Sequence, residues 1–297
     1  MLVSQNIAIV TNKLYLTAQI LGCVFAVLTY SIYSEANFIE ESLMNVDLFL
    51  GGDTSQPLNI NLRTEIIRLN CGDDTTSIVE VGCGSGGYFD ALRNIFSIVT
   101  GLEPNTSKIE KTVKNNKIIE GTAEKIPFED GSFSNVLINE VLEHVADDDL
   151  ALRETHRILG VGGRLFLFAP NHCYPFESHG FLNFVGKSKW MWVPGLKYFP
   201  SFFLGFFGVK KWARGYFKFA LSRRLEKQGF YVVKSGYIPQ TFENISGQQP
   251  LFLRRNPRFL ILLRRATATL SKIPVFNALI CVSFYVVAEK KKSSRLL

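Results

Sequence analysis

The chain has 297 residues, of which 47% are hydrophobic and 20% are charged. This composition excludes an intrinsically disordered protein and provides enough apolar residues for a substantial core. The formal net charge of +7 is unevenly distributed: residues 1–170 contain 12 basic and 22 acidic side chains, whereas residues 171–297 contain 21 and 4.

The first segment, residues 1–70, is expected to be helical. Residues 14–34 contain no charged side chain, and a helix of this length can cross a bilayer. Polar residues interrupt the segment, however, and a span with Lys13 inside would place the rest of the chain outside the cell. We therefore favour a helix that packs on the protein or lies in the membrane interface, with a spanning helix as the alternative. The N-terminus lacks a basic n-region and an obvious cleavage site, so no secretory signal is expected.

A glycine-rich turn follows a short apolar run at residues 78–87, Ile-Val-Glu-Val-Gly-Cys-Gly-Ser-Gly-Gly. Glycine allows backbone angles that other residues avoid, and a following helix offers free N–H groups, so the segment is typical of a nucleotide-like cofactor site. Two patterns fit it. Gly82, Gly84 and Gly87 form the dinucleotide fingerprint G-x-G-x-x-G, whereas an acid-x-G-x-G-x-G pattern begins at Glu80. A turn without a ligand is a further alternative.

Alternating apolar runs and helical stretches predict a parallel sheet covered on both faces by helices. Strands are expected near residues 77–81, 97–102, 117–120, 134–138, 163–169, 229–233 and 278–287. Helices are expected near residues 218–228 and at residues 148–159, where one face is formed by Leu150, Leu152, His156 and Leu159.

The second expected strand ends at Glu103, about 20 residues after the glycines. An acidic side chain at this place can accept hydrogen bonds from both hydroxyls of a ribose. Because NAD and other nucleoside cofactors share the ribose, Glu103 supports a nucleoside without choosing among them. A solvated carboxylate at the strand end is the alternative.

Four further motifs follow in order: Gly-Thr-Ala-Glu-Lys-Ile-Pro-Phe at 121–128, Ser-Phe-Ser-Asn-Val-Leu at 132–137, Glu-Val-Leu-Glu-His-Val at 140–145 and Arg-Ile-Leu-Gly-Val-Gly-Gly at 157–163. With the glycine turn, this succession resembles the type 11 branch of the class I S-adenosylmethionine-dependent methyltransferases, whose pattern is A-E-x-L-P-F, S-F-D-x-V, L-E-H-V and R-x-L-x-P-G-G. The resemblance covers roughly residues 75–170. The chain departs from the usual residues of the pattern at Thr122, Asn135 and Val161.

The resemblance implies an α/β fold, with a doubly wound, mostly parallel sheet of seven strands, hydrophobic cap insertions, and a last strand antiparallel beside the fifth. It implies S-adenosylmethionine as the cofactor, with the carboxylate of Glu80 facing the ammonium group of the methionine half. The cofactor contacts expected on this basis are Glu80, Gly82, Cys83, Gly84, Gly86, Glu103, Ala123, Glu124 and Asn139. An NAD-dependent oxidoreductase would keep the glycines but leaves the later motifs unexplained.

Methyl transfer requires an aligned acceptor and, where the acceptor loses a proton, a base. His144 is the first candidate for this catalytic role because an unperturbed imidazole has a pKa near neutrality. His179 is the second, since the stretch 170–180 is similar to the start of the substrate-recognition region in type 11 relatives. The same stretch also contains His172, Tyr174 and Glu177, which are expected to face the acceptor.

A metal site is the alternative use of the Glu-x-x-Glu-His array formed by Glu140, Glu143 and His144. On one helical turn these side chains could hold a divalent cation. The Leu-Glu-His part is common in type 11 relatives without metal, so no metal is predicted. The five cysteines show no C-x-x-C pair and no zinc spacing, which favours a reduced, cytoplasmic compartment.

The basic second part combines aromatic and cationic residues. Residues 171–217 are rich in Phe, Trp and Tyr interleaved with lysines, and are expected to cap the active site. In a second insertion, near residues 240–276, arginines surround the apolar run 259–263. This combination suits an anionic membrane surface. Nucleic acid is less favoured because the cap is too apolar for bases, and an ordinary basic surface over a phenylalanine core is the third alternative.

The sequence thus predicts four segments: N-terminal helical residues 1–70, a cofactor-binding core at 71–170, an aromatic basic cap at 171–217, and the end of the core sheet at 218–297. The predicted function is methyl transfer from S-adenosylmethionine to a small-molecule, lipid or lipid-linked glycan acceptor. The protein is expected to be cytoplasmic, as a peripheral protein at the inner face of the membrane. An NAD-dependent oxidoreductase, an RNA methyltransferase and a non-catalytic S-adenosylmethionine-binding protein are the alternatives. The acceptor atom and the oligomeric state are not predicted.

Overall fold

The computed structural model describes residues 57–105, 107, 117–176, 181–182, 188–189, 198, 210–211, 213–243 and 251–291. The predictions for residues 14–34, for Glu177 and His179, and for most of the aromatic cap lie outside these residues. Among the residues that are described, no helix is long and apolar enough to cross a bilayer.

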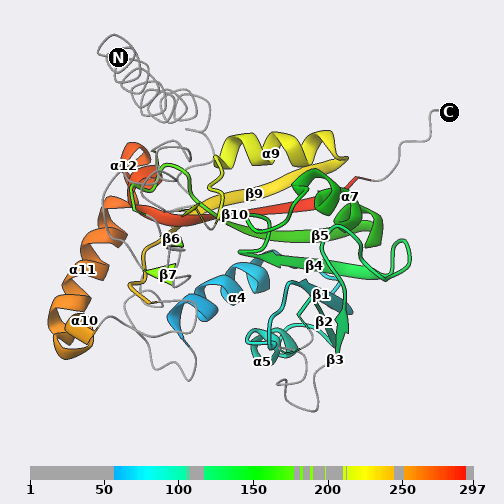
Figure 1. Ribbon diagram of the computed structural model, residues 1–297, viewed down its shortest axis with the longest axis horizontal. Coiled ribbons are helices and arrows are strands. Elements are labelled where there is room, and N and C mark those ends of the chain that lie inside the picture. Colours follow the sequence, from blue (N-terminus) through cyan, green and yellow to red (C-terminus); the bar gives the residue numbers. More distant parts are fainter. Residues whose placement is uncertain are drawn as a thin grey trace, which may run out of the picture.

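A seven-stranded sheet in the order β3-β2-β1-β4-β5-β10-β9 organises the fold (Figure 1). Five neighbouring strands pair in parallel, and β10 runs antiparallel to both β5 and β9. The prediction of a doubly wound, mostly parallel sheet with an antiparallel last strand is therefore confirmed. The strands are β1 Ser77–Val81, β2 Ile98–Glu103, β3 Lys117–Glu120, β4 Phe133–Asn139, β5 Leu159–Pro170, β9 Phe230–Pro239 and β10 Cys281–Lys290.

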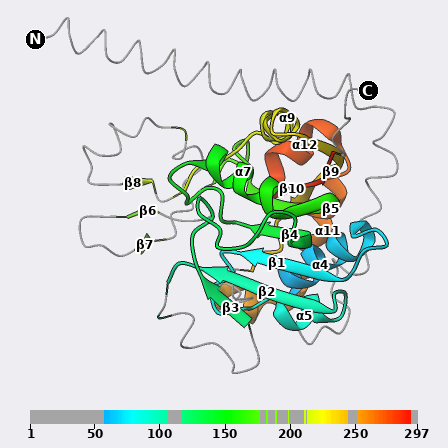
Figure 2. The same ribbon diagram turned by 90° about the vertical axis from the view of Figure 1, so that its right-hand side faces the viewer.

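Helices cover both faces of this sheet (Figure 2). Three short strands, β6 Phe181–Leu182, β7 Ser188–Lys189 and β8 Lys210–Lys211, form a separate sheet within the region expected to be the cap. The helices are α4 Leu58–Asn70, α5 Phe89–Arg93, α7 Asp148–Ile158, α9 Lys218–Lys227, α10 Leu251–Arg255, α11 Pro257–Leu270 and α12 Pro274–Ile280.

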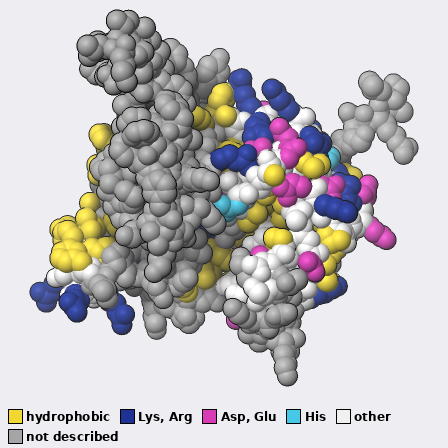
Figure 3. Space-filling view, viewed as in Figure 1, with side chains coloured by type: hydrophobic (Ala, Val, Ile, Leu, Met, Phe, Trp, Pro, Cys, Tyr) yellow, Lys and Arg dark blue, Asp and Glu magenta, His cyan; other side chains and the backbone are white. Residues whose placement is uncertain are grey.

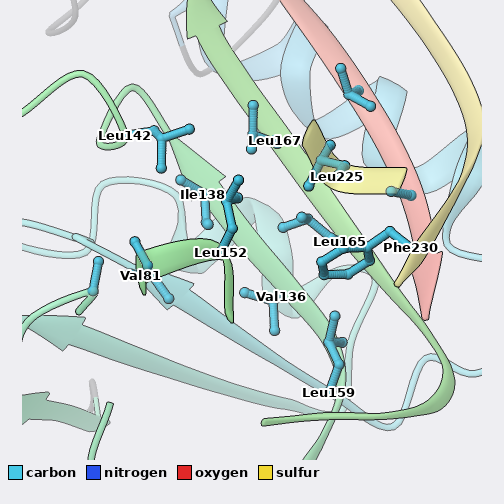
Figure 4. Close-up of a cluster of buried hydrophobic side chains, with 14 of the residues drawn as sticks. Val81, Val136, Ile138, Leu142, Leu152, Leu159, Leu165, Leu167, Leu225 and Phe230 are labelled. Carbon is cyan, nitrogen blue, oxygen red and sulfur yellow. The ribbon is translucent and has the colours of Figure 1, made fainter. Parts of the chain in front are cut away.

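Two hydrophobic cores form because successive side chains of a strand point to opposite faces of the sheet. On β5, Leu165 and Leu167 join the core beneath α7 and α9, whereas Phe166 and Phe168 join the core beneath α4 and α5. Figure 4 shows part of the first of these cores, in which side chains of the strands meet those of α7 and α9, such as Leu152 and Leu225. The central strands are buried on both faces, which explains why they are nearly continuous apolar runs in the sequence.

The last strand starts later than the sequence predicted. Residues 278–280, expected in a strand, instead end helix α12, and β10 begins at Cys281. Pro274 occupies the first turn of α12, a position where proline favours a helix start. At the other end, the buried Asn171 side chain donates hydrogen bonds to the carbonyl oxygens of Ala278 (2.6 Å) and Cys281 (2.8 Å), which satisfies acceptors that a helix C-terminus leaves open.

The buried face of α7 also differs from the prediction. Ala151, Leu152, Thr155 and Ile158 are buried there, whereas Leu150 and His156 are only partly buried and Leu159 already belongs to β5. The prediction placed large side chains on the inner face of the helix. The small side chains of Ala151 and Thr155 let the helix approach the sheet closely, so they take the inner positions.

Gly101, on the central part of β2, provides a test of this packing. A Cβ atom at this position would lie 2.4 Å from Sγ of Cys83 and 2.7 Å from Cζ of Phe89. Gly101→Ala is therefore expected to lower the free energy of unfolding by about 1–3 kcal/mol, measured by urea denaturation. Gly87→Ala is the control, because a Cβ there meets no atom within 4 Å, and it should change stability by less than about 0.5 kcal/mol. Equal effects of the two substitutions would show that Gly101 does not limit the packing.

Candidate cofactor and active site

The glycine turn after β1 uses three glycines whose conformations disfavour side chains. Gly82, Gly84 and Gly86 have φ angles of 72°, 58° and 81°. At Gly82 a Cβ would also lie 2.5 Å from a methyl carbon of Val141, whereas at Gly84 it would meet nothing within 4 Å. The turn thus packs against the protein at its start and borders open space at Gly84, where a ligand can approach the backbone.

Gly87 distinguishes the two cofactor patterns. In the dinucleotide fingerprint the third glycine permits close packing of the helix on the strand. Gly87 lacks a positive φ angle, and a Cβ there would meet no atom within 4 Å. Gly86 in the same turn does have a positive φ. The backbone therefore follows the acid-x-G-x-G-x-G pattern that begins at Glu80.

Glu80 is a buried carboxylate in the middle of the sheet. Its side chain is on β1, between Gly101 of β2 and Leu137 of β4, and the residue is 3% exposed. Its Oε2 atom has no hydrogen-bond partner among the described residues. Burial without a compensating cation raises the pKa of Glu80 to about 8. An ammonium group placed beside it would restore the charged form, so the residue fits the methionine half of S-adenosylmethionine.

Glu103 connects the end of β2 to the glycine turn. It is 3% exposed, and its two carboxylate oxygens accept hydrogen bonds from the backbone N–H groups of Gly84 (2.8 Å) and Asn105 (3.1 Å). The alternative of a solvated strand-end carboxylate is therefore wrong. Each carboxylate oxygen can accept more than one hydrogen bond, so this arrangement is compatible with the predicted contacts to ribose hydroxyls. Cys83, the remaining member of the turn, is buried against the position of Gly101.

Ala123 and Glu124, two of the predicted cofactor contacts, lie in the loop after β3. Ala123 is buried, and Oε1 of Glu124 accepts a hydrogen bond from the backbone N–H of Ala146 at 2.8 Å. The Glu124 side chain therefore ties this loop to the one that follows β4. Among the departures from the family pattern, Asn135 is buried and its side-chain amide donates to the carbonyl oxygen of Asp74 at 2.8 Å, a bond that an aspartate could not donate.

Arg63, which the sequence analysis did not select, links α4 to the end of β4. Its guanidinium donates hydrogen bonds to Oδ1 of Asn139 and, at 2.7 Å, to Oε1 of Glu140. The buried Tyr88 hydroxyl interacts with both Arg63 and Asn139. Arg63 could have been identified from its spacing, because it lies three residues after Ile60 and three before Ile66, on the buried face of the helix.

The Glu-x-x-Glu-His array lies in a series of turns after β4, so the assumed helical turn is wrong. Glu140 has a positive φ of 54° and forms its ion pair with Arg63. Glu143 has a fully buried side chain, and His144 lies beside it, with its Nε2 3.9 Å from Oε1 of Glu143 and its side chain 36% exposed. In the part of the chain that the structure describes, no group of three or more His, Cys, Asp or Glu side chains could hold a metal ion.

Residues at the end of the cap segment hold this series of turns in place. The hydroxyl of Tyr216 donates to the carbonyl oxygen of Leu142 at 2.8 Å, and the backbone N–H of Arg214 donates to the carbonyl oxygen of Glu143 at 3.4 Å. The position of His144 therefore depends on contacts between segments about 70 residues apart in the sequence.

The segment after β5 contributes two of its four predicted acceptor-facing residues to the described structure. Tyr174 is 6% exposed, and its hydroxyl accepts a hydrogen bond from Nε2 of Gln240 at 3.4 Å. Burial raises the pKa of Tyr174 to about 12. His172 packs between the rings of Tyr198 and Phe217, at centroid distances of 5.7 and 4.5 Å. Both side chains take part in packing, so a role in facing the acceptor remains a prediction, as it does for His179 and Glu177.

Comparison with known proteins agrees with this geometry. Residues 79–167 match the family described as a methyltransferase domain. Residues 79–167 therefore carry a class I S-adenosylmethionine-dependent methyltransferase domain of the type 11 branch. S-adenosylmethionine is the methyl donor of this family, and the match spans the strands β1 to β5 that carry Glu80, Glu103 and Asn139.

Two curated relatives each match 30% of the chain. A demethylmenaquinone methyltransferase of Staphylococcus aureus is 34% identical over 97 residues, which cover 30% of this chain and 40% of the relative. YrhH of Bacillus subtilis, named as a candidate methyltransferase, is 28% identical over 99 residues, 30% of this chain and 55% of the relative. The chain therefore spans about half the length of the curated relatives that it matches.

A solved structure extends the likeness of the fold beyond this domain. It is a candidate sarcosine dimethylglycine methyltransferase of Galdieria sulphuraria, which is 13% identical with a TM-score of 0.50 and covers 79% of this chain and 85% of its own. The predicted fold class agrees with this likeness.

Arg63 and Arg68 provide matched substitutions on one helix. Arg63→Ala would leave the Glu140 carboxylate, 11% exposed, without its guanidinium, so we expect a loss of about 3–5 kcal/mol in unfolding free energy. Arg68 forms an ion pair with Glu65 at 2.6 Å but is 58% exposed, so Arg68→Ala should cost less than about 1 kcal/mol. Urea denaturation of both variants measures the difference. Similar losses would mean that the ion pair with Glu140 does not organise the site.

Proposed function

We propose that the whole chain is an S-adenosylmethionine-dependent methyltransferase whose acceptor is a lipid or a lipid-linked glycan at a membrane surface. The assignment of the methyl donor rests on the buried carboxylate of Glu80. One of its oxygens has no hydrogen-bond partner among the described residues, and the residue precedes a glycine turn that is open at Gly84. A cofactor with an ammonium group satisfies this carboxylate, whereas the pyrophosphate of NAD would be repelled by it.

The residues of the site have distinct roles in this proposal. Glu80 binds the ammonium group, Glu103 binds the ribose hydroxyls, and the backbone at Ala123 lies against the adenine. Arg63 positions Asn139 and Tyr88 at the end of β4. When bound, the cofactor supplies a methyl group activated on a sulfonium. Burial of the site by α4 and α5 keeps water away from Glu80, so that its pairing with a cation is strong.

His144 is the proposed catalytic base for an acceptor that must lose a proton. Its ring is partly exposed, while the adjacent Glu143 side chain is fully buried and lies 3.9 Å away. A carboxylate at this distance can pair with the positive charge that His144 gains when it takes the proton of the acceptor. His179 stays the second candidate for this role.

The acceptor class rests on the second part of the chain. That part has 21 basic and 4 acidic residues and is rich in aromatic side chains. Apolar and aromatic residues next to cations suit an acyl or isoprenoid chain with an anionic headgroup better than they suit nucleotide bases. The name of the Staphylococcus aureus relative, a demethylmenaquinone methyltransferase, is consistent with an apolar acceptor.

Calorimetry with S-adenosylhomocysteine and with NAD tests the donor. We expect S-adenosylhomocysteine to bind and NAD not to bind. Because the pKa of Glu80 is raised to about 8, its carboxyl is mostly protonated at pH 7, and pairing with ammonium requires loss of that proton. Affinity should therefore rise between pH 6 and pH 8, by up to about tenfold per pH unit, and level off above pH 8.

Glu80→Gln should lower the affinity for S-adenosylhomocysteine about 10- to 100-fold and make the affinity less dependent on pH. Glu129→Gln, at an exposed acidic position outside the site, is the control and should keep both the affinity and its slope. Binding of NAD, or a slope that persists in Glu80→Gln, would refute the assignment of the donor site.

Turnover is measured as transfer of a labelled methyl group to a lipid extract. His144→Ala should abolish transfer while S-adenosylhomocysteine still binds, since the base acts on the acceptor. His156→Gln is the matched control, because that imidazole packs on Phe230 at a centroid distance of 5.0 Å, away from the glycine turn. Transfer that survives in His144→Ala would dismiss His144 as the base, and label that appears only in added RNA would replace lipid as the acceptor.

A further inference from the structure

Helices α10, α11 and α12 form a surface with an unusual number of exposed apolar side chains. We refer to this segment, residues 251–280, as the helical arm. Among the described residues, fourteen large apolar side chains are exposed, and eight of them belong to the arm. Phe252 and Leu262 are 64% and 61% exposed, and the rings of Phe252 and Phe259 lie 5.9 Å apart. Clusters of this kind mark sites of interaction with another apolar phase or partner.

All charged side chains of the arm are basic. Residues 251–280 contain five arginines and one lysine and no acidic residue. Arg264 is buried, whereas Arg254, Arg255, Arg258, Arg265 and Lys272 are exposed. Figure 3 shows apolar side chains in this region bordered by a row of cationic ones. The exposed surface is therefore an apolar patch with a positive fringe.

The arm is fixed to the sheet by a buried ion pair. Nη2 of Arg264 lies 2.9 Å from Oε1 of Glu243, and the guanidinium also donates two hydrogen bonds to the carbonyl oxygen of Thr241, at 3.2 and 3.1 Å. Side-chain exposures of 9% for Arg264 and 7% for Glu243 make this attachment costly to break. The outward side chains of α11 consequently keep one orientation relative to the sheet.

The attachment point lies at the edge of the sheet that carries the cofactor site. Strand β9 is antiparallel to β10, which is antiparallel to β5, so β9 ends at the same edge as β1 and β4. Thr241 and Glu243 follow directly after that end. A second attachment of the arm is on α11, where Ala268 packs against Leu58 and Leu62 of α4, the helix that carries Arg63.

Charge and side-chain type together select the occupant of this surface. A second copy of the chain, docked through the same patch, would bring arginines against arginines. RNA would be attracted by the charge and can stack on phenylalanine, but five of the eight exposed apolar side chains of the arm are leucine or isoleucine, which offer no stacking surface for bases. An anionic bilayer satisfies both features, because its headgroups attract the arginines and its acyl chains accept the apolar side chains.

We infer that the helical arm docks on an anionic membrane through Phe252, Phe259 and Leu262, with Arg254, Arg255 and Arg258 on the headgroups. This docking places the edge of the sheet that carries the cofactor site beside the bilayer. The inference extends the proposed function by naming the surface that meets the lipid, and lipid binding without donor or acceptor can be tested separately from methyl transfer.

The test is co-sedimentation of the full chain with two kinds of vesicle. One kind is phosphatidylcholine alone, and the other contains about 30% phosphatidylglycerol, which makes its surface anionic. Wild type should bind the anionic vesicles, and binding should weaken in about 1 M salt because screening shortens the reach of the charges. Replacing Phe252, Phe259 and Leu262 together by Ser should weaken binding at least about tenfold. Replacing Arg254, Arg255 and Arg258 by Gln should weaken it about fivefold for each charge.

Matched substitutions elsewhere on the surface control for general effects. Val161→Ser with Tyr231→Ser removes apolar side chains of the same exposure, 64% and 61%, outside the arm. Replacing Arg153, Arg223 and Lys227 by Gln removes three exposed charges from α7 and α9. These variants should bind like wild type.

Three results would overturn the inference. The first is equal binding of the arm variants and their controls. The second is a dimer, seen by light scattering, that the arm substitutions dissociate while vesicle binding is absent. The third is an arm that binds an RNA oligonucleotide but not vesicles. Loss of methyl transfer with intact vesicle binding would instead count against the proposed function alone.

Discussion

The buried carboxylate of Glu80 is the constraint on which the rest of the site depends. A charged group without a cation in the middle of a sheet costs folding free energy, and the protein accepts this cost by holding the carboxyl at a raised pKa of about 8. A neutral side chain of similar shape would remove the cost. A ligand that places a cation beside this carboxylate would offset the cost of its burial, and that compensation would contribute to the affinity for such a ligand.

The topology of the sheet places this group where a ligand can reach it. The chain adds β2 and β3 on one side of β1 and then crosses to β4 on the other, so β1 and β4 flank the switch point at which open α/β sheets bind their ligands. The glycine turn follows β1 at this point, and the bond from the Gly84 N–H to Glu103 fixes the shape of the turn. Gly101 makes room for Cys83 behind the turn. Preorganisation of this kind reduces the entropy that binding would otherwise cost.

How much could be predicted from the sequence depended on how local the signal was. Strands β1, β3 and β4 are short apolar runs next to turn residues, and their ranges were predicted within a residue. The spacing of α4 indicates that Arg63 is on its buried face but not what it binds, because its partners, Asn139 and Glu140, are more than 70 residues away. The arrangement of Glu140, Glu143 and His144 could not be predicted for the same reason. The turns that carry these residues are held by Arg214 and Tyr216, at the end of the cap segment.

The helical arm and the cofactor site are positioned by the same elements, α4 and β9, so the orientation of the arm is linked to that of the site. Helix α4 contacts the arm through Leu58 and Leu62 and reaches the end of β4 through Arg63 one residue later. Strand β9 ends at Pro239, shortly before Glu243, the partner of Arg264, and it pairs along its length with β10. The arm is therefore attached to this edge of the sheet at two places, by the Arg264–Glu243 ion pair and by the packing of Ala268 on α4. A membrane bound at the arm would thus meet the site in one orientation, and an apolar acceptor could pass from the bilayer without crossing water.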